Sequence, residues 1–155
     1  MILATLCYIR KDGRTLMLHR NKQEGDIHKD MYVAPGGKFD PGEGSEECVI
    51  REILEESGLT IINPQLRGFA SFINKNCKIK EDWYVFIYET GKFSGKLKTD
   101  IKDGELEWVL DSLLGSLPMR EGDYLILDWL KQPRIFSAKL TYENDRLARH
   151  EVFFY

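Results

Sequence analysis

Apolar residues gather in short runs along the chain, with turn residues between them. The first run covers residues 2–9, ends in a turn at Asp12-Gly13 and resumes over residues 15–20. Such runs are typical of two strands joined by a tight turn, because glycine accepts the positive φ that the turn requires. The N-terminal part is therefore predicted to be a β-hairpin. The polar residues 21–30 are predicted to form a loop that faces solvent or a substrate.

A helical pattern occupies residues 45–57. Ser45 can cap its first turn, Glu46 and Glu47 suit the positive end of the helix dipole, and Gly58 suits the left-handed position after the last turn. At about 100° per residue, the helix has an apolar side and an acidic side. The apolar side consists of Val49, Ile50, Ile53 and Leu54, and the acidic side consists of Glu52, Glu55 and Glu56.

The rest of the chain alternates strands with two further helical segments. Strands are predicted over residues 59–62, 66–73, 83–88 and 106–110, a short helix over 111–114 and a longer helix over 122–130. A terminal hairpin is predicted from residues 135–142 and 147–154, with a turn between them. This order predicts an α/β fold, one domain over residues 1–155 with a mixed β-sheet between helices.

Composition and charge exclude several classes of protein. The 155 residues are 43% hydrophobic and 30% charged, which is typical of one globular core. The formal net charge of -3 and the scattered basic residues argue against a nucleic acid polymer as partner. Three cysteines without a C-x-x-C pair favour a reducing cytoplasm over a disulfide framework or a zinc site. The run over residues 2–9 is too short to cross a bilayer, so no membrane is expected, and the oligomeric state stays open.

The acidic side of the helix is the most concentrated chemistry in the sequence. Carboxylates at i, i+3 and i+4 repel one another unless a cation lies between them, and their oxygens suit Mg²⁺ or Mn²⁺. A solvated helix face would explain this spacing as well. The turn Gly36-Gly37-Lys38 favours the metal, because its backbone groups can approach the same cation and a bound anion. Arg51 can pair with Glu55 and fix its position.

Other catalytic patterns are missing from the sequence. There is no G-x-G-x-x-G before a helix, no G-K-[ST] of a P-loop and no G-x-S-x-G of a serine hydrolase. His19, His28 and His150 are scattered and are interpreted as surface or structural residues.

The glycine turn and the acidic helix fall into one fixed pattern. Gly37 is followed after five residues by Glu43, and after seven more by Arg51-Glu52-Ile53-Leu54-Glu55-Glu56-Ser57-Gly58-Leu59. This stretch resembles the Nudix box, the signature of MutT-like hydrolases, with every fixed position filled. The resemblance implies a Nudix-type α/β/α sandwich with the mixed sheet between helices.

The resemblance also implies a metal site. Glu52, Glu55 and Glu56, with the carbonyl of Gly37, would bind Mg²⁺, and Mn²⁺ would be a substitute. Arg51 would orient the glutamates. Metal ions in such a site activate water and neutralise developing charge.

The reaction implied by the resemblance is attack of water on a phosphorus of a nucleoside diphosphate linked to a further group, which cleaves a pyrophosphate bond. Glu56 is expected to accept the proton, with Glu105 or Asp103 on a later loop as alternatives. Glu43 is expected to stabilise the junction between loop and helix.

The substrate is expected to be a small nucleotide. The glycine turn and the terminal hairpin are similar to those of the branch that hydrolyses oxidised purine nucleoside triphosphates such as 8-oxo-dGTP, a step in nucleotide-pool cleaning and DNA repair. Arg20 and Lys38 would contact phosphates. The expected base contacts are Val33, Phe72, Trp83 and Glu121, with Asp123 as a substitute for the last. The alternatives are ADP-ribose, a dinucleoside polyphosphate, a nucleotide sugar, coenzyme A, a capped RNA end, or a Nudix domain that binds without turnover.

Overall fold

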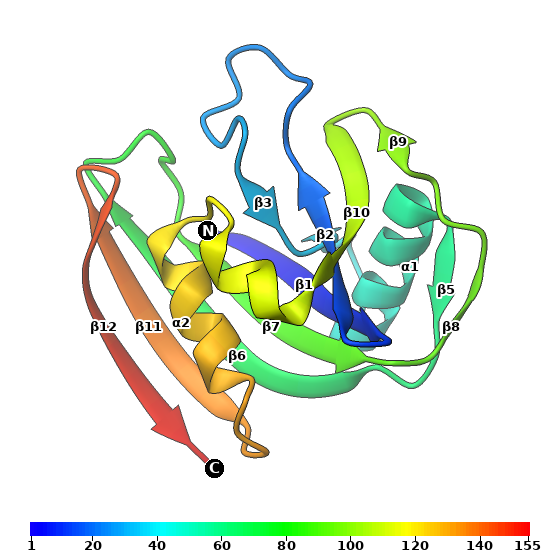
Figure 1. Cartoon of the computed structure of the whole chain (residues 1–155). Coiled ribbons are helices and arrows are strands. Elements are labelled where there is room, and N and C mark those ends of the chain that lie inside the picture. The colour runs from blue at the N-terminus through cyan, green and yellow to red at the C-terminus, as the bar shows by residue number, and fades with distance from the viewer.

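Two helices pack against a mixed β-sheet in the computed structural model, which describes residues 1–155 (Figure 1). The sheet has the order β12-β11-β6-β7-β1-β2-β10-β9, with β3 beside β2 and β4 beside β1. Its strands are β1 (Ile2–Lys11), β2 (Arg14–His19), β3 (Tyr32–Val33), β4 (Gly36–Lys38), β6 (Gln65–Lys75), β7 (Trp83–Thr90), β9 (Asp100–Ile101), β10 (Gly104–Leu110), β11 (Phe136–Glu143) and β12 (Arg146–Phe154).

The helices are α1 (Ser45–Ser57) and α2 (Glu121–Trp129), with a 3-10 helix η1 (Asp111–Ser116). β5 (Leu59–Ile61) and β8 (Phe93–Gly95) form a separate two-stranded sheet. The pairs β1–β7 and β6–β11 are parallel and the other neighbours in the sheet are antiparallel. The predicted α/β fold with a mixed sheet is confirmed.

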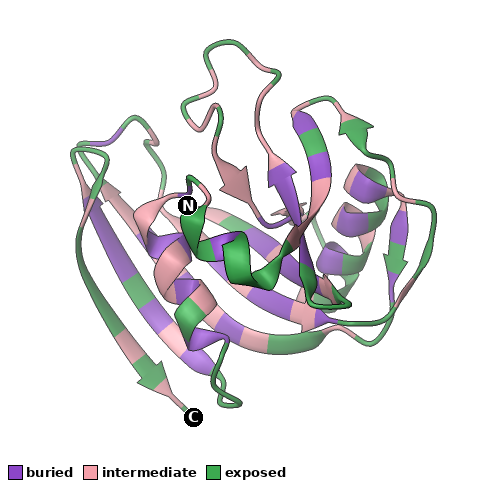
Figure 2. Cartoon of the chain, viewed as in Figure 1, coloured by how far each residue is buried: buried purple, intermediate pink, exposed green.

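β1 divides the core in two, because side chains along a strand point alternately to opposite faces. Tyr8 belongs to a buried cluster with Ile126 of α2, whereas Cys7 and Ile9 belong to a second cluster with Ile53 of α1. Figure 2 shows the buried positions concentrated along the central strands and on the sheet-facing sides of the helices. The two helices therefore cover opposite faces of the sheet.

The first hairpin forms as predicted but opens directly after its turn. β1 pairs with β2 only at the two positions next to the turn, and β2 then pairs with β10. In the space beside β1 lies β4, with Gly37 opposite Thr5 and Gly36 opposite Leu6. β4 is three residues long and has no alternating pattern, so the sequence did not predict it. It brings the glycine turn between the middle of the sheet and α1.

The predicted N-cap of α1 is wrong. The cap residue is Gly44, whose N–H donates to Glu47 Oε1 at 3.0 Å. The Ser45 hydroxyl instead forms a hydrogen bond with the Tyr88 hydroxyl at 2.6 Å. The C-terminal prediction is confirmed, because Gly58 has a φ of 80° and its N–H donates to Leu54.

The predicted apolar side of α1 is partly wrong. Ile50 and Leu54 are 36% and 46% exposed. At 3.6 residues per turn, residues four positions apart lie in a row along the helix. The row next to the buried Val49 and Ile53 contains Glu52 and Glu56. Carboxylates therefore adjoin the core on this side of the helix. The buried residues are Cys48, Val49, Ile53 and Ser57.

The short strands were the least predictable elements. β5 forms close to where it was predicted, but it pairs with β8 and does not extend the main sheet. β8 and β9 lack an alternating pattern and were not predicted. Neither α1 nor α2 has the length and apolar character of a helix that crosses a membrane.

Candidate active site

α1 places two glutamates against the glycine turn. A side chain on Gly37 would overlap the carboxylate of Glu52, and one on Gly36 would overlap the carbonyl of Thr5. The N–H of Gly36 lies 3.4 Å from Glu56 Oε1. Glycine is therefore required for β4 to lie between β1 and α1, and it brings both carboxylates to the backbone of the turn.

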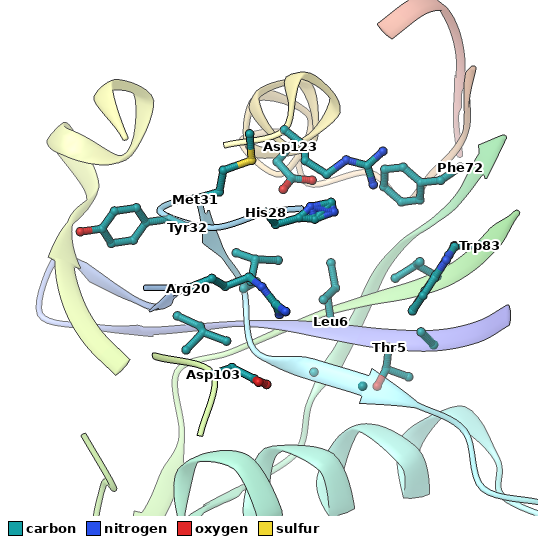
Figure 3. A pocket seen from close by; sticks show the side chains of 18 of the residues that line it. Thr5, Leu6, Arg20, His28, Met31, Tyr32, Phe72, Trp83, Asp103 and Asp123 are labelled. Carbon is teal, nitrogen blue, oxygen red and sulfur yellow. The ribbon is translucent and has the colours of Figure 1, made fainter. Parts of the chain in front are cut away.

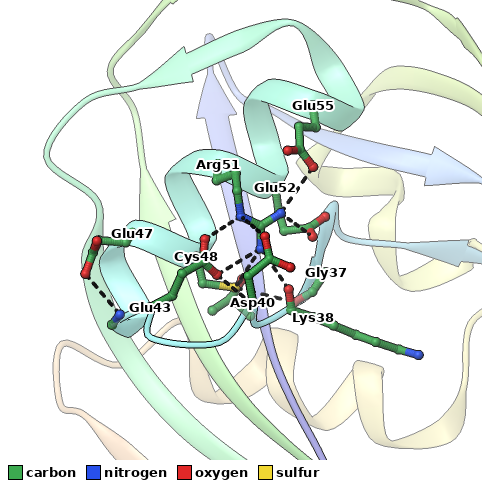
Figure 4. A network of polar contacts seen from close by, with 11 residues as sticks. Gly37, Lys38, Asp40, Glu43, Glu47, Cys48, Arg51, Glu52 and Glu55 are labelled. Atoms are coloured by element: carbon green, nitrogen blue, oxygen red, sulfur yellow. Dashed lines mark hydrogen bonds and ion pairs between the residues drawn. The ribbon is translucent and has the colours of Figure 1, made fainter.

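Arg51 connects the glutamates of α1 to the loop before it (Figure 4). Its Nη1 donates to Glu52 Oε1 at 2.8 Å and to Glu55 Oε2 at 3.1 Å. Its Nε and Nη2 bind the two oxygens of Glu43, and Nη2 also donates to the carbonyl of Lys38 at 2.9 Å. The Arg51 guanidinium holds the pKa of Glu43 at about 2. Arg51 thus fixes the loop, the turn and two glutamates relative to one another.

Glu56 carries a carboxyl that is largely removed from water. Burial raises its pKa to about 7, and the carboxylates of Glu52 and Asp103 act in the same direction. The N–H of Gly36 and the guanidinium of Arg20 lower it. A carboxyl with a pKa near neutrality is suited to accept and release protons.

A cavity of about 410 Å³ extends from Glu56 over the sheet. This volume falls in the range of about 300–1,000 Å³ that is usual for small-molecule sites. Figure 3 shows Arg20 and Asp103 toward one part of its wall. The residues of this polar end are Arg20, Gly36, Gly37, Lys38, Glu56 and Asp103.

The other end of the cavity combines aromatic rings with a buried carboxyl (Figure 3). Asp123 at the start of α2 is 7% exposed, and no protein group donates a hydrogen bond to its carboxyl. The Arg120 guanidinium lies 5.8 Å from the centre of the Phe72 ring. This part of the lining, called the apolar end for its rings, contains Phe72 and Trp83 together with His28 and Asp123.

Comparison with known proteins matches residues 2–130 to the family model described as NUDIX domain. This chain belongs to the NUDIX domain family. The Nudix hydrolase YvcI of Bacillus subtilis (strain 168) is 35% identical over 140 residues, which are 89% of this chain and 85% of YvcI. An ADP-ribose pyrophosphatase of Methanocaldococcus jannaschii is 33% identical over 99 residues, 63% of this chain and 56% of that protein. The crystal structure of a mutator MutT protein from Bacillus halodurans has a TM-score of 0.87 and 29% identity, and the match covers 98% of this chain and 97% of that one.

The chain is thus a Nudix hydrolase with a MutT-like fold. Nudix hydrolases bind small nucleotides and generally use divalent metal ions.

The predicted metal ligands have protein partners in this structure. Arg51 Nη1 binds both Glu52 and Glu55, and Glu56 faces the N–H of Gly36. No group of three or more Asp, Glu, His or Cys side chains is gathered as a metal site. Their chemistry fits a hard divalent cation, since carboxylate and carbonyl oxygens are its preferred ligands. The missing side chain at Gly37 leaves room for the Glu52 carboxylate beside the backbone of the turn. The donor set of Glu52, Glu55, Glu56 and the Gly37 carbonyl therefore fits such a cation.

The two predicted phosphate contacts both line the cavity. Arg20 is fixed by Asp26, whose Oδ2 accepts from Arg20 Nε at 2.8 Å. Lys38 reaches over the Trp83 ring, with Nζ 5.4 Å from its centre. Val33 and Phe72 also line the cavity, as predicted for base contacts. Cationic groups and aromatic surface thus lie in the same cavity.

Five predicted site residues do not line this cavity: Arg51, Glu52, Glu55, Glu105 and Glu121. Glu105 on β10 is opposite His19 and accepts from the Asn21 amide at 3.4 Å. Glu121 accepts from Arg146 Nε at 2.7 Å and lines a neighbouring cavity. Asp103 and Asp123 line the cavity in their place.

His28 is a cavity residue that the sequence did not single out. This residue was interpreted as surface or structural, but it lines the cavity and its buried Nδ1 has no partner. His28 belongs to the polar loop that the sequence allowed to face a substrate. That loop was the one signal that could have pointed to it.

Asp123 is expected to give stability an unusual dependence on pH. Burial raises the pKa of its carboxyl from 3.8 to about 6, with the Arg120 guanidinium acting in the opposite direction. Because the folded pKa is the higher one, the unfolded chain loses its proton first as pH rises. The contribution of Asp123 to the free energy of unfolding therefore falls by about 3 kcal/mol between about pH 4 and pH 7.

Asp123→Asn should remove this decline. Urea unfolding of both proteins at several pH values measures the effect. The free energy of unfolding of the variant, minus that of the wild type, should increase from about pH 4 to pH 7. The matched control is Asp128→Asn, on the same helix with 69% of the side chain exposed, which should leave the wild-type profile unchanged. Parallel profiles for Asp123→Asn and the wild type would contradict the assignment.

Proposed function

We propose that this Nudix hydrolase is a Mg²⁺-dependent pyrophosphohydrolase of purine nucleoside triphosphates such as 8-oxo-dGTP. It would release monophosphate and pyrophosphate and so clean the nucleotide pool. The observation that carries the proposal is a single cavity with Glu56 and cationic side chains at one end and aromatic rings with Asp123 at the other. A nucleoside triphosphate has the same polarity, with anionic phosphates at one end and a flat base at the other.

The acidic helix would hold the metal. Glu52, Glu55, Glu56 and the Gly37 carbonyl are the proposed ligands of Mg²⁺, with Mn²⁺ as a substitute. When bound, the metal supplies positive charge for the phosphates and lowers the pKa of bound water. Arg51 keeps Glu52 and Glu55 close to the turn through its bonds of 2.8 and 3.1 Å.

Glu56 is the proposed general base. Its raised pKa, caused by burial, matches the requirement that a base accept a proton near neutral pH. Asp103 is the alternative, because it also lines the cavity, whereas Glu105 does not. Arg20 and Lys38 would bind the phosphates and offset the charge that develops on them.

The base would lie against Phe72, Trp83 and Val33. Asp123 faces the cavity without a protein donor, so a base that offers N–H groups would satisfy its carboxylate. A guanine edge presents two neighbouring donors, whereas the corresponding adenine edge presents one donor and one acceptor. The carboxylate therefore favours guanine over adenine. Glu121 lines the neighbouring cavity and is not among these proposed base contacts.

A substrate panel tests the proposal. Hydrolysis of 8-oxo-dGTP, dGTP, dATP, ADP-ribose and a diadenosine polyphosphate is followed by product analysis with Mg²⁺, with EDTA, and with EDTA followed by excess Mg²⁺. We expect pyrophosphate and monophosphate from the guanine triphosphates, faster turnover of these than of dATP, no turnover with EDTA, and recovery with Mg²⁺. Equal turnover of dATP and dGTP would contradict the role of Asp123.

A second candidate is a nucleoside diphosphate linked to another group, such as ADP-ribose. The observation that favours it is the similarity to an ADP-ribose pyrophosphatase over 99 residues. The same panel separates the two, because ADP-ribose would yield AMP and ribose phosphate without pyrophosphate. Tight binding of a nucleotide without any product would instead indicate a Nudix domain that only binds.

A further inference from the structure

The loop of residues 21–30 has a fixed shape although it contains no helix or strand. Asp26 is at its centre, with 9% of the side chain exposed. Its Oδ2 accepts from Arg20 Nε at 2.8 Å and its Oδ1 accepts from the His28 N–H at 2.9 Å. The Lys29 N–H donates to the Asp26 carbonyl at 3.0 Å. One carboxylate thus joins the start of the loop to its far side.

The two ends of the loop are closed by backbone hydrogen bonds. The Arg20 N–H donates to the Met31 carbonyl at 2.9 Å, and the Asp30 N–H donates to the Arg20 carbonyl. Next to them, the rings of His19 and Tyr32 stack with their centres 4.3 Å apart. The loop is therefore attached to β2 and β3 and keeps its position relative to the cavity.

Asp26 determines where Arg20 can reach. With Nε bound to Asp26, the two Nη groups of Arg20 have no protein acceptor and face the polar end of the cavity (Figure 3). Glu56, whose pKa the Arg20 guanidinium lowers, and Asp103 also line that end. Asp26 offsets the charge of Arg20 and keeps its side chain from collapsing onto Glu56, which leaves the Nη groups available for an anion.

The same loop places His28 at the apolar end. Its backbone N–H is fixed by Asp26, and its ring lines the cavity that Asp123 also lines. Burial, with the Arg120 and Arg20 guanidiniums, lowers the pKa of His28, so the ring is neutral at pH 7. Because Nδ1 is buried, Nε2 is the ring nitrogen that can meet a ligand, as a donor or as an acceptor according to the tautomer. Asp123 offers only acceptors when ionised. The two side chains together present a mixed pattern to a bound base.

We infer that the loop of residues 21–30 is the specificity element of this Nudix hydrolase, with Asp26 as a positioning residue for Arg20 and His28 as a contact to the base. The inference rests on the proposed function for the orientation of the nucleotide. In this arrangement one loop influences both the phosphates and the base of the substrate. Phosphate placement depends on Asp26, and choice of base depends on His28 together with Asp123 of α2.

Steady-state kinetics of two variants test the two roles. Asp26→Asn keeps the size of the side chain but loses the charge that holds Arg20, so KM should rise about tenfold for 8-oxo-dGTP, dGTP and dATP alike. Asp26→Glu should recover part of this loss. His28→Ala should instead change the ratio of kcat/KM between dGTP and dATP by about tenfold, since a neutral hydrogen bond to the base is lost.

Asp30→Asn is the matched control in the same loop. Asp30 is exposed with a φ of 68°, a conformation that asparagine also accepts, so its kinetics should equal those of the wild type. Thermal unfolding of each variant checks that the fold persists. An unchanged KM in Asp26→Asn, or an equal loss with every base in His28→Ala, would overturn the inference.

Failure of the proposed function would be recognised separately. If ADP-ribose is the better substrate of the wild type, the triphosphate proposal fails. The loop is then tested by the ratio of kcat/KM between ADP-ribose and its guanine counterpart, measured in the wild type and in His28→Ala. A base ratio that still changes in His28→Ala would support the loop, and an unchanged ratio would reject it.

Discussion

Replacing Glu56 with glutamine is expected to lower kcat by about 10³-fold, within the range of roughly 10²- to 10⁴-fold that a general base contributes. An amide cannot accept the proton of the attacking water, and it is a weaker ligand for Mg²⁺ than a carboxylate. The loss should be present with every nucleotide of the panel, because Glu56 lies at the phosphate end. Initial rates at saturating substrate and Mg²⁺ measure it.

A Mg²⁺ titration separates the two roles of Glu56. If the residue acts only as a metal ligand, excess Mg²⁺ should recover much of the rate of Glu56→Gln. If it is the base, the rate should stay low at every Mg²⁺ concentration. Glu52→Gln and Glu55→Gln should mainly raise the Mg²⁺ concentration needed for half of the full rate.

The matched control for Glu56 is Glu46→Gln. Glu46 lies in the first turn of the same helix, is exposed and does not line the cavity, so kcat should be unchanged. A wild-type rate for Glu56→Gln at ordinary Mg²⁺ would contradict its role both as base and as ligand.

Arg51→Lys is expected to lower kcat/KM by about 10- to 100-fold, the usual cost of losing a residue that orients metal ligands. A lysine ammonium cannot reproduce the planar fork that binds Glu43, Glu52, Glu55 and the Lys38 carbonyl together. The glutamates would lose their fixed distance to the turn. Kinetics at several Mg²⁺ concentrations should show a weaker response to the metal as well as a lower rate.

Arg67→Lys is the control for the loss of an arginine with several partners. Arg67 binds Glu89 Oε1 at 2.5 Å and the carbonyl of Leu130 at 3.2 Å, and 14% of its side chain is exposed. It does not line the cavity. This variant should lose about 1–3 kcal/mol of stability with little change in kcat. An equal loss of kcat in both variants would mean that Arg51 acts only through stability.

Local sequence was sufficient to predict the elements whose hydrogen bonds are local. α1 has the bounds that its pattern predicts, because Gly58 supplies the left-handed residue after its last turn. The two hairpins also follow their turns. Asp12-Gly13 and Asn144-Asp145 all have positive φ, which a tight turn requires and which these residue types accept.

The orientation of α1 depended on tertiary contacts. Its sequence offers apolar residues in two directions, and the pattern alone assigned Ile50 and Leu54 to the core. In the fold, β4 and β1 pack against the side of the helix that carries Cys48 and Val49. Ile50 and Leu54 are left exposed, and Glu52 and Glu56 lie toward the glycine turn. Helix periodicity fixes which residues share a side, but only the packing partner decides which side is buried.

The apolar end of the cavity could not be predicted for the same reason. His28 comes from a loop near the N-terminus and Asp123 from the start of α2, and no local pattern relates residues so far apart. The sheet brings them together. β2 and β3 flank the loop, and α2 packs on one face of the sheet over β1 and β7. Glu121, which was predicted as a base contact, binds Arg146 and lines the neighbouring cavity.

By itself, the sequence determined the family, the acidic helix and the chemistry of the reacting end. These depend on residues within one continuous stretch, Gly37 to Leu59, whose spacing is set by a turn and a helix. The tertiary structure decided which carboxylates face the turn, how Asp26 fixes Arg20, and which side chains line the cavity. Those features require contacts between segments far apart in the chain, and such contacts form only when the strands pair and the helices cover the two faces of the sheet.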